Sequence, residues 1–391
     1  MTTLQTKIIQ DSTSIDPTTG SVNVPLYLSS TFHQFDFDQY GKYDYSRSQN
    51  PTREVLENAI ASLENGVQGF AFASGMAAIS TAFLLLSQND HVLVSEDVYG
   101  GTYRVVSQIL DRYGIEHTFV DTTDLDKVAA AIQSNTKVIY IETPSNPTLK
   151  ITDIQGIAKL AKANNCFTFV DNTFMTPVFQ RPLELGADLV LHSATKFLSG
   201  HSDVLAGLAV AKDKGLAEQL AFLQNSFGGI LGAYDSWLLL RGIKTLHVRM
   251  EASSQSAAKI AEYLNSQEEI QHVYYPGISA HTGYEIHKYQ SSSAGAVLSF
   301  RLESDDAVRQ FKDNIKLPLF AVSLGGVESI LSYPAKMSHA AMPKKVREKR
   351  GITDGLLRLS VGLEDPDDLI RDIEQALSKI KKGGKLVDAI S

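Results

Sequence analysis

Cysteine is almost absent from this sequence, since Cys166 is the only one in 391 residues. That scarcity excludes a disulfide framework and any metal site built on cysteine ligands. Cys166 lies between the segments KANN and FTFVD, which favours a small core residue over a nucleophile. The motif HExxH is also missing, and His192 and His201 alone make a weak case for a ligand set, so we expect no bound metal.

The sequence also has no long hydrophobic run. No apolar segment approaches the roughly 20 residues that a membrane helix needs, and the start, MTTLQTKIIQDSTS, lacks the apolar core of a signal peptide. We therefore expect a cytoplasmic protein without a membrane partner. No GxxxxGK[ST] loop is present and no GxGxxG follows the first expected strand, which argues against a nucleotide-binding oxidoreductase.

Positive charge is in the minority, because 36 Lys and Arg residues stand against 44 Asp and Glu residues, for a net charge of −8. This balance argues against nucleic acid as the main partner. Hydrophobic residues make up 43% of the chain and charged residues 20%, as in a soluble globular enzyme. The length suffices for two domains, or for one large α/β domain with an appendage.

The first fifty residues are rich in Ser, Thr, Asp, Tyr and Gln, which predicts an extended arm with little core of its own. From residue 52, where TREVLENAIASLEN has the pattern of an amphipathic helix, short apolar runs alternate with helical segments. The expected strands are 69–74, 91–95, 117–121, 137–142, 167–171, 188–193 and 206–211. Such alternation predicts the α/β class, with a mostly parallel sheet covered by helices on both faces.

The rest of the chain has a different pattern. Residues 235–264 are expected to form one long helix that leads into a second domain. Beyond it, shorter strand-like and helical segments predict a smaller α+β domain, followed by a loose tail at 381–391. We therefore predict an N-terminal arm at 1–50, a large domain at 51–245 and a C-terminal domain at 246–391.

The segment LHSATKFLSGHSD places Lys196 among small hydroxyl residues, directly after an apolar strand. In a doubly wound sheet, ligands bind at the carboxyl ends of the strands, and Asp171 lies at such an end, after FTFV. The sequence SGM at 74–76 opens a helix whose free N–H groups would favour an anion. An amine, a carboxylate and a phosphate cradle are together what pyridoxal phosphate requires.

Two further residues suit that cofactor and an amino-acid substrate. Tyr99, in EDVYGGTYR, follows a strand and could stack on a planar ring. Arg358, in LLRLS, could hold a substrate carboxylate through its forked guanidinium group. Each residue also has an ordinary structural explanation, such as capping for Asp171 or a surface amine for Lys196. The combination in this order therefore carries the prediction, rather than any single residue.

Long motifs along the chain resemble those of the pyridoxal-phosphate enzymes of cysteine and methionine transsulfuration, which belong to the fold-type I, aspartate-aminotransferase-like group. The matching motifs are YDYSRSQNPTRE, FAFASGMAAI, DVYGGTYR, IETPSNP, VDNTF, HSATKFLSGHSD, SLGGVES and LLRLSVGLED. They span nearly the whole chain. The resemblance implies pyridoxal 5'-phosphate as the cofactor and a smaller C-terminal α+β domain beside the parallel sheet.

The resemblance also implies a role for each site residue. Lys196 would hold the cofactor and carry protons, Asp171 would pair with the pyridine nitrogen and Tyr99 would stack on the ring. The phosphate cradle would consist of Gly75, Met76, Ser193 and Thr195, completed by Tyr45 and Arg47 from the arm of the neighbouring subunit. The substrate would be held by Asn146, Ser323 and Arg358, with Arg104 at its distal end.

A site shared between subunits implies an obligate dimer, and the family usually forms a homotetramer, a dimer of dimers. The stretches TKFLSGHSD and VSLGGVESILSYPAKMSHAAMP resemble most those of bacterial cystathionine β-lyases, which implies cleavage of cystathionine to homocysteine, pyruvate and ammonia. Cystathionine γ-synthase and γ-lyase share nearly all these residues and remain the alternatives, since Glu328 fits more than one activity. A member that has lost catalysis is a further alternative, although every expected catalytic position is present.

Overall fold

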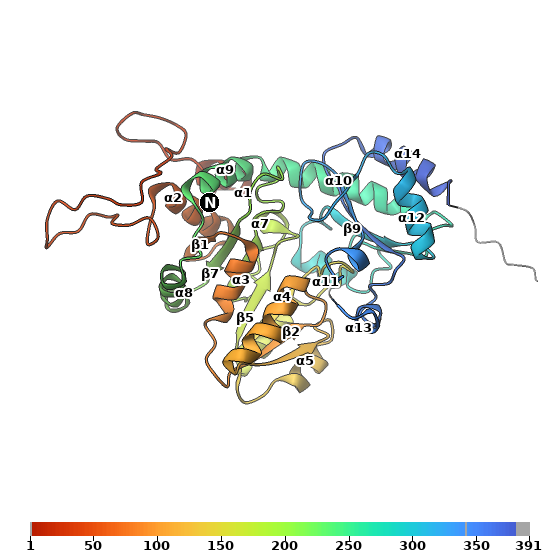
Figure 1. The fold of residues 1–391 in the computed structure, drawn as a ribbon, viewed down its shortest axis with the longest axis horizontal. Helices are drawn as coiled ribbons and strands as arrows, with labels where there is room; N and C mark the ends of the chain where they lie inside the picture. Colours follow the sequence, from red (N-terminus) through yellow and green to blue (C-terminus); the bar gives the residue numbers. More distant parts are fainter. Residues whose placement is uncertain (1, 341, 381–391) are drawn as a thin grey trace, which may run out of the picture.

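The structure, a computed structural model, describes residues 2–340 and 342–380 and is built around two β-sheets (Figure 1). The larger sheet has the strand order β1-β7-β6-β5-β4-β2-β3, and β7 is antiparallel to its neighbours while the pairs from β6 to β3 are parallel. Its strands are β1 (Gln68–Phe72), β2 (His91–Ser95), β3 (Glu116–Val120), β4 (Thr136–Glu142), β5 (Phe167–Asp171), β6 (Leu189–Ser193) and β7 (Gly207–Ala211). All seven expected strands are present within two residues of their predicted limits, which confirms the mostly parallel sheet.

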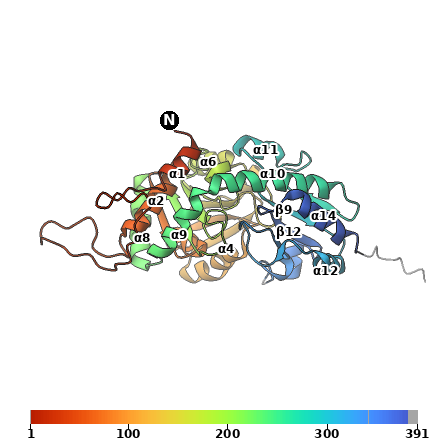
Figure 2. The same ribbon diagram turned by 90° about the horizontal axis from the view of Figure 1, so that it is seen from above.

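Helices cover both faces of this sheet, as predicted, and Figure 2 shows α1 and α6 on the side opposite α4. One apolar core lies under α1 (Leu4–Gln10), α2 (Pro51–Glu64), α5 (Leu125–Ala131), α6 (Ile154–Ala163) and α9 (Ala233–Lys244). The core on the other face includes α3 (Gly75–Phe83), α8 (Lys214–Phe227) and the π and 3₁₀ turns at Val105–Ile109 and Leu110–Tyr113 that continue α4 (Gly100–Arg104). The short α7 (Thr176–Phe179) follows β5.

The helix α2 illustrates how the sequence sets these elements. Asn50 caps its first turn by accepting hydrogen bonds from the backbone N–H groups of Thr52 and Arg53, and Pro51 occupies the first helical position. The helix ends at Asn65, whose left-handed backbone is favoured at helix ends. Leu56 and the other apolar residues of one face are buried against the sheet. The predicted amphipathic helix is therefore confirmed.

The smaller sheet has the order β10-β11-β12-β9-β8, and α10, α12 and α14 pack on it. Its strands are β8 (His272–Tyr274), β9 (Val297–Arg301), β10 (Leu319–Phe320), β11 (Ile330–Ser332) and β12 (Leu356–Ser360). The helices of this part are α10 (Leu246–Asn265), α11 (Tyr284–Gln290), α12 (Asp305–Asn314), α13 (Lys344–Lys349) and α14 (Pro366–Leu377), with a 3₁₀ turn at Pro334–Lys336. This mixed sheet with its helices confirms the predicted α+β unit.

The expectation of one helix over 235–264 is wrong, because α9 and α10 are separated at Thr245. The backbone of Thr245, at φ −106° and ψ 5°, leaves the helical range. The buried guanidinium of Arg249 stabilises the break, since it donates to the carbonyls of Gly242 at 2.6 Å and Phe197 at 2.7 Å. The limits 1–50, 51–245 and 246–391 remain predicted domain limits, and the tail at 381–391 lies outside the described residues.

The N-terminal arm extends beyond the larger sheet, at the end of the molecule opposite the smaller sheet (Figure 1). Its loops carry large apolar side chains in the open, with Phe35 90% and Phe37 97% exposed. Trp237 of α9 anchors the arm by donating its indole N–H to the carbonyl of Val24 at 3.1 Å. The arm is thus anchored to its own subunit through α1 and Val24, while its loops around Phe35 and Phe37 leave a large apolar surface exposed.

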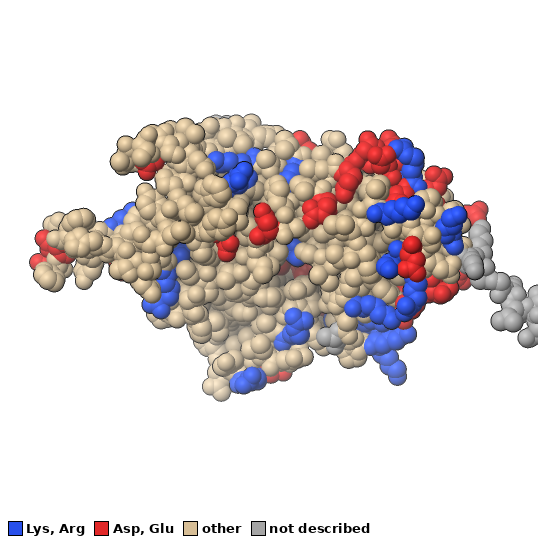
Figure 3. Space-filling model, turned by 45° about the horizontal axis from the view of Figure 1, so that its top comes forward, with Lys and Arg blue, Asp and Glu red and all other residues tan. Residues whose placement is uncertain are grey.

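Charged side chains of both signs are interspersed on the face drawn in Figure 3, and they gather at the end with the smaller sheet. The surface near the arm is mostly uncharged in that view. Within residues 2–340 and 342–380, no helix has the length and apolar content that crossing a membrane requires.

Candidate active site

The polar residues singled out in the sequence meet at the carboxyl ends of β4, β5 and β6. Asp171 is the last residue of β5, and Lys196 lies in the turn that follows β6. Asn146 lies in the loop after β4, whereas Tyr99 follows β2 and opens α4. Because these strands are parallel, their ends lie at one edge of the sheet, where ligands bind in this architecture.

The amine of Lys196 is partly buried and reaches the loop between β10 and β11 of the smaller sheet. Its Nζ donates to the hydroxyl of Ser323 at 2.6 Å. The turn is held by its own backbone, with the N–H of Lys196 donating to Ser193 and the N–H of Gly200 donating to Lys196. Burial, and then the positive charge of Arg358, lower the pKa of Lys196 to about 8. A substantial fraction of this amine is therefore neutral near physiological pH.

Arg358 is buried in β12 and faces the same space. Its guanidinium donates to the Asn146 side-chain oxygen at 2.7 Å, to the Ser323 carbonyl at 2.5 Å and to the Ser332 hydroxyl at 3.1 Å. Burial lowers its pKa to about 10. The buried Nε–H has no hydrogen-bond partner within the described residues. A buried guanidinium with a free donor and no carboxylate bonded to it is suited to bind an anion.

Two buried carboxylates stand side by side at the sheet edge, because Glu142 pairs with Asp171 in register between β4 and β5. Burial raises the pKa of both groups, and for Glu142 the nearby charge of Asp171 adds to the effect. Asp171 accepts from the Thr173 N–H at 3.0 Å and from the Tyr140 hydroxyl at 3.3 Å, and it faces no cationic partner within hydrogen-bond distance among the described residues. A cationic N–H donor would stabilise its charged form.

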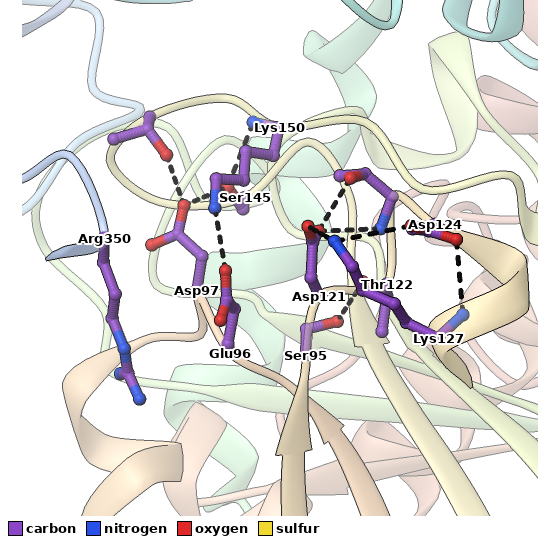
Figure 4. Close-up of polar contacts among 12 residues, drawn as sticks. Ser95, Glu96, Asp97, Asp121, Thr122, Asp124, Lys127, Ser145, Lys150 and Arg350 are labelled. Atoms are coloured by element: carbon purple, nitrogen blue, oxygen red, sulfur yellow. Dashed lines mark hydrogen bonds and ion pairs between the residues drawn. The ribbon is translucent and has the colours of Figure 1, made fainter. Parts of the chain in front are cut away.

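Glu142 orients the neighbouring loops. Its two oxygens accept from the backbone N–H of Tyr99 and from that of Asn146, both at 2.9 Å. Figure 4 shows a second contact set in the same loops, where Ser145 donates to Asp97 at 2.6 Å and Lys150 to Glu96 at 3.1 Å. These bonds join the loop after β2 to the loop after β4. They therefore fix the positions of Tyr99 and Asn146 relative to each other.

The first turn of α3 forms the other end of the site. Ser74 caps this helix by accepting from the N–H of Ala77, so the N–H groups of Gly75 and Met76 have no acceptor within the helix. A Cβ on Gly75 would lie 2.9 Å from the Cβ of Ser193, so only glycine allows this approach to β6. The hydroxyl of Thr195 is already engaged, because it donates to the Ala206 carbonyl and accepts from its N–H.

Three predicted site residues lie apart from this group within one chain. Tyr45 and Arg47 lie exposed on the arm, where the guanidinium of Arg47 stands over the Tyr45 ring at 5.7 Å. Arg104 is exposed at the end of α4, and no hydrogen bond or ion pair joins its side chain to the described residues. The contacts of a single subunit do not bring these side chains to Lys196.

Sequence reasoning missed Glu142, Tyr140 and Ser332 as members of the site. Glu142 could have been found, because it ends its strand just as Asp171 does. Tyr140 and Ser332 lie within buried strands, where the sequence pattern alone indicates only core positions. Their hydroxyl groups reach Asp171 and Arg358 because β4 pairs with β5 in the larger sheet, and because Ser332 lies opposite Arg358 between β11 and β12 in the smaller one.

The residues present fit pyridoxal phosphate. Lys196 offers a partly neutral amine, Asp171 a buried carboxylate with few partners, and α3 free amide donors for a phosphate. The loop after Tyr99 is also closely fitted, because a Cβ on Gly101 would lie 2.5 Å from the Tyr99 ring and 2.6 Å from the sulfur of Met76. Amine, acid, anion cradle and aromatic ring thus surround one space.

Residues 5–378 match the model of the family described as Cys/Met metabolism PLP-dependent enzyme. The chain belongs to this family. Membership confirms the predicted cofactor, pyridoxal phosphate, and the resemblance inferred from the motifs. The chain is 64% identical over 378 residues to "Cystathionine beta-lyase MetC" of Bacillus subtilis, covering 97% of each chain. It is also 53% identical to "Cystathionine gamma-lyase" of the same organism, over 96% of this chain and 99% of that one.

The solved structure of cystathionine gamma-lyase from Lactobacillus plantarum, complexed with L-serine, has the same fold. The two chains are 47% identical and superimpose with a TM-score of 0.94, over 97% of this chain and 99% of the other. This likeness confirms the predicted fold class of the pyridoxal-phosphate enzyme.

Proposed function

We propose that the protein is a cystathionine β-lyase, which cleaves cystathionine to homocysteine, pyruvate and ammonia. One observation carries the proposal: the Lys196 amine contacts Ser323, and the Ser323 carbonyl is bound by Arg358. The proton-carrying amine and the receptor for a substrate carboxylate thereby face one space. An amino acid held by its carboxylate at Arg358 would present its α-carbon to Lys196.

We assign the remaining residues in the same way. Asp171 would hold the pyridine nitrogen protonated, Tyr99 would stack on the ring, and Asn146 and Ser323 would orient the carboxylate with Arg358. The phosphate group would be bound by Gly75, Met76 and Ser193, and by Thr195 once its hydroxyl donates to a phosphate oxygen in place of the Ala206 carbonyl. Tyr45 and Arg47 from a second subunit would complete that cradle, and Arg104 would contact the distal end of a long substrate.

The chemistry that pyridoxal phosphate supplies when bound is an electron sink conjugated to the substrate's α-carbon. Lys196 removes the α-proton, for which its lowered pKa leaves it partly neutral at physiological pH. Arg358 restricts rotation of the substrate through its carboxylate, so that the proton faces the amine. As the bond between the β-carbon and sulfur breaks, Lys196 can return a proton to the departing sulfur, which leaves as the thiol of homocysteine. Water then hydrolyses the remaining three-carbon enamine to pyruvate and ammonia.

The γ-specific activities remain the second candidate. The Lys196 amine could equally move a proton from the β-carbon, as γ-elimination or γ-replacement requires, and both β-lyases and a γ-lyase are close relatives. The greater identity to the β-lyase, 64% against 53%, favours β-elimination. Glu328, whose carboxylate is bonded to the Ser202 hydroxyl, does not decide between these activities.

We also propose that the chain works in the cytoplasm as a homotetramer, a dimer of dimers with shared sites. The exposed arm supports this assembly, because its apolar loops and the pair Tyr45 and Arg47 have no site to complete in their own subunit. Size-exclusion chromatography with light scattering measures the oligomer directly. A monomer with full activity would contradict the shared site.

Incubating the purified enzyme with cystathionine and pyridoxal phosphate, and identifying the keto acid, tests the function. Pyruvate with homocysteine is the expected result. 2-Oxobutyrate with cysteine would overturn β-elimination in favour of the γ-lyase activity, and a protein that accepts only an O-acylhomoserine with cysteine would be a γ-synthase. Lys196→Ala serves as the control and is expected to lose both the cofactor's visible absorbance and the activity.

A further inference from the structure

Arg53, in the first turn of α2, is an almost completely buried arginine with 1% exposure. Its guanidinium donates to three consecutive carbonyls of the arm, those of Ser46 at 2.7 Å, Arg47 at 3.3 Å and Ser48 at 3.1 Å. The side chains of Tyr45 and Arg47 lie exposed on the same segment. The carbonyls therefore turn inward to Arg53 while these two side chains turn outward.

The charge of Arg53 is compensated within α2. Its Nε lies 3.4 Å from a carboxylate oxygen of Glu57, one helical turn later. That carboxylate is fixed in turn by the N–H of Ala71 in β1 at 2.9 Å and by the Gln224 amide of α8 at 3.3 Å. The guanidinium is thus oriented, through Glu57, by contacts with α2, β1 and α8. Removing one partner of such a buried pair is costly, because the other charge is then left buried and unpaired.

Asn50 adds to this support. Its side-chain amide donates to the Tyr27 carbonyl at 2.9 Å and to the Ser46 hydroxyl at 3.1 Å, while its oxygen caps α2. The arm has little apolar core of its own, so without such bonds its backbone would sample many conformations. The start of α2 therefore orders the segment 45–48 within its own subunit.

We infer that Arg53 is a positioning residue that shapes the segment Tyr45–Ser48 for use in the active site of a neighbouring subunit. The inference rests on the proposed function, in which Tyr45 and Arg47 bind the cofactor phosphate in trans. A pre-ordered segment binds more tightly because less conformational entropy is lost on binding. Arg53 itself touches neither cofactor nor substrate, and its effect falls on the partner's site.

We call the hydrogen bonds from the Arg53 guanidinium to the carbonyls of Ser46, Arg47 and Ser48 the clamp. The test removes the clamp without leaving a buried charge. Arg53→Met alone would strand the Glu57 carboxylate, so the double variant Arg53→Met/Glu57→Gln is used. Lys42→Met is the matched control, because it removes an ion pair between arm and α2 at the surface, 62% exposed, without touching residues 46–48. Arg53→Lys keeps the positive charge but loses the forked guanidinium that binds several carbonyls at once. Its affinity for pyridoxal phosphate is expected to lie between that of the double variant and that of the wild type.

Two measurements on the cofactor-free protein report on the clamp directly. The Kd for pyridoxal phosphate, from absorbance titration, is expected to rise about 10- to 100-fold in the double variant and to stay unchanged in Lys42→Met. Hydrogen exchange of the Ser48 and Gln49 amides, which donate to the Tyr45 carbonyl, is expected to accelerate. Unchanged affinity together with unchanged exchange would overturn the inference.

A mixed assembly identifies the subunit that Arg53 serves. The double variant is co-expressed with Lys196→Ala under a second affinity tag, and assemblies carrying both tags are purified. A site that combines Lys196 of the double variant with the intact arm of the Lys196→Ala subunit is expected to bind the cofactor covalently with wild-type affinity. Absence of such recovery would mean that Arg53 acts within its own site, and would refute the inference.

The variant Arg47→Ala separates this inference from the proposed function. If Arg47→Ala leaves the Kd unchanged, the phosphate contact in trans is wrong, and the clamp has no site to serve. If Arg47→Ala weakens binding while the double variant does not, the proposed function stands and the role of Arg53 alone is refuted.

Discussion

The amine of Lys196 is expected to react with an amine-directed reagent much faster than an ordinary lysine in the cofactor-free protein. Burial and Arg358 lower its pKa from 10.5 to about 8. At pH 8 about one half of these amines are neutral, against about 0.3% for a lysine with the ordinary value. Only the neutral amine is a nucleophile, so the reactive fraction at this pH is about 150-fold larger. A less basic amine is also intrinsically less nucleophilic, which reduces the expected gain in labelling rate to about 10-fold.

The two causes of the lowered pKa can be separated by substitution. Arg358→Met removes the second positive charge from beside Lys196, so the pKa of Lys196 is expected to rise and labelling at pH 8 to slow. Arg358→Lys keeps the charge and is expected to leave the midpoint close to that of the wild type. Burial is the larger cause of the lowered pKa, and it persists in Arg358→Met. The pKa of Lys196 in this variant is therefore expected to stay below 10.5.

The assay is labelling of cofactor-free protein with a small reagent between pH 6 and pH 11, followed by mass spectrometry of the peptide that contains residue 196. Lys196→Met provides the blank. The labelling rate is expected to rise with pH and to level off above a midpoint near 8. A midpoint near 10.5 would refute the argument, because Lys196 would then be charged at physiological pH.

Three other predictions concern the site and the core. Arg358→Lys loses the forked guanidinium that binds Asn146 and Ser323. KM for the amino-acid substrate, measured by steady-state kinetics, is therefore expected to rise about 10- to 100-fold. An unchanged KM would exclude Arg358 from substrate binding. Asp171→Asn removes the buried negative charge, so kcat is expected to fall at least about 100-fold, while absorbance shows that the cofactor is still bound; full activity would contradict the assignment. Leu56→Ala leaves a cavity at a fully buried position of α2. The free energy of unfolding, measured by denaturant titration, is expected to fall by about 2–5 kcal/mol. A loss below about 1 kcal/mol would contradict this, because it would mean that neighbouring side chains fill the cavity.

The strands of the larger sheet could be predicted from the sequence because most of them are short apolar runs that the sheet buries, as in β2, β4 and β7. The local turn around Lys196 was equally predictable, since small residues and glycine surround one long cationic side chain. The single helix expected over 235–264 was wrong for a tertiary reason. The break at Thr245 is stabilised by Arg249, whose partner Phe197 lies about fifty residues earlier in the sequence.

Local sequence by itself thus determined the strands, most helices and the identity of the chemically active groups, because periodicity, capping and residue type act over a few positions. Only the tertiary structure decided which of these groups meet. Lys196 contacts Ser323, and Arg358 contacts Asn146, across 127 and 212 residues of chain. The lowered pKa of Lys196 is likewise tertiary, since it arises from burial between two sheets and from a charge on the second one. The residue type determines which functional group a side chain carries, but its dielectric surroundings and its partners exist only once the chain has folded.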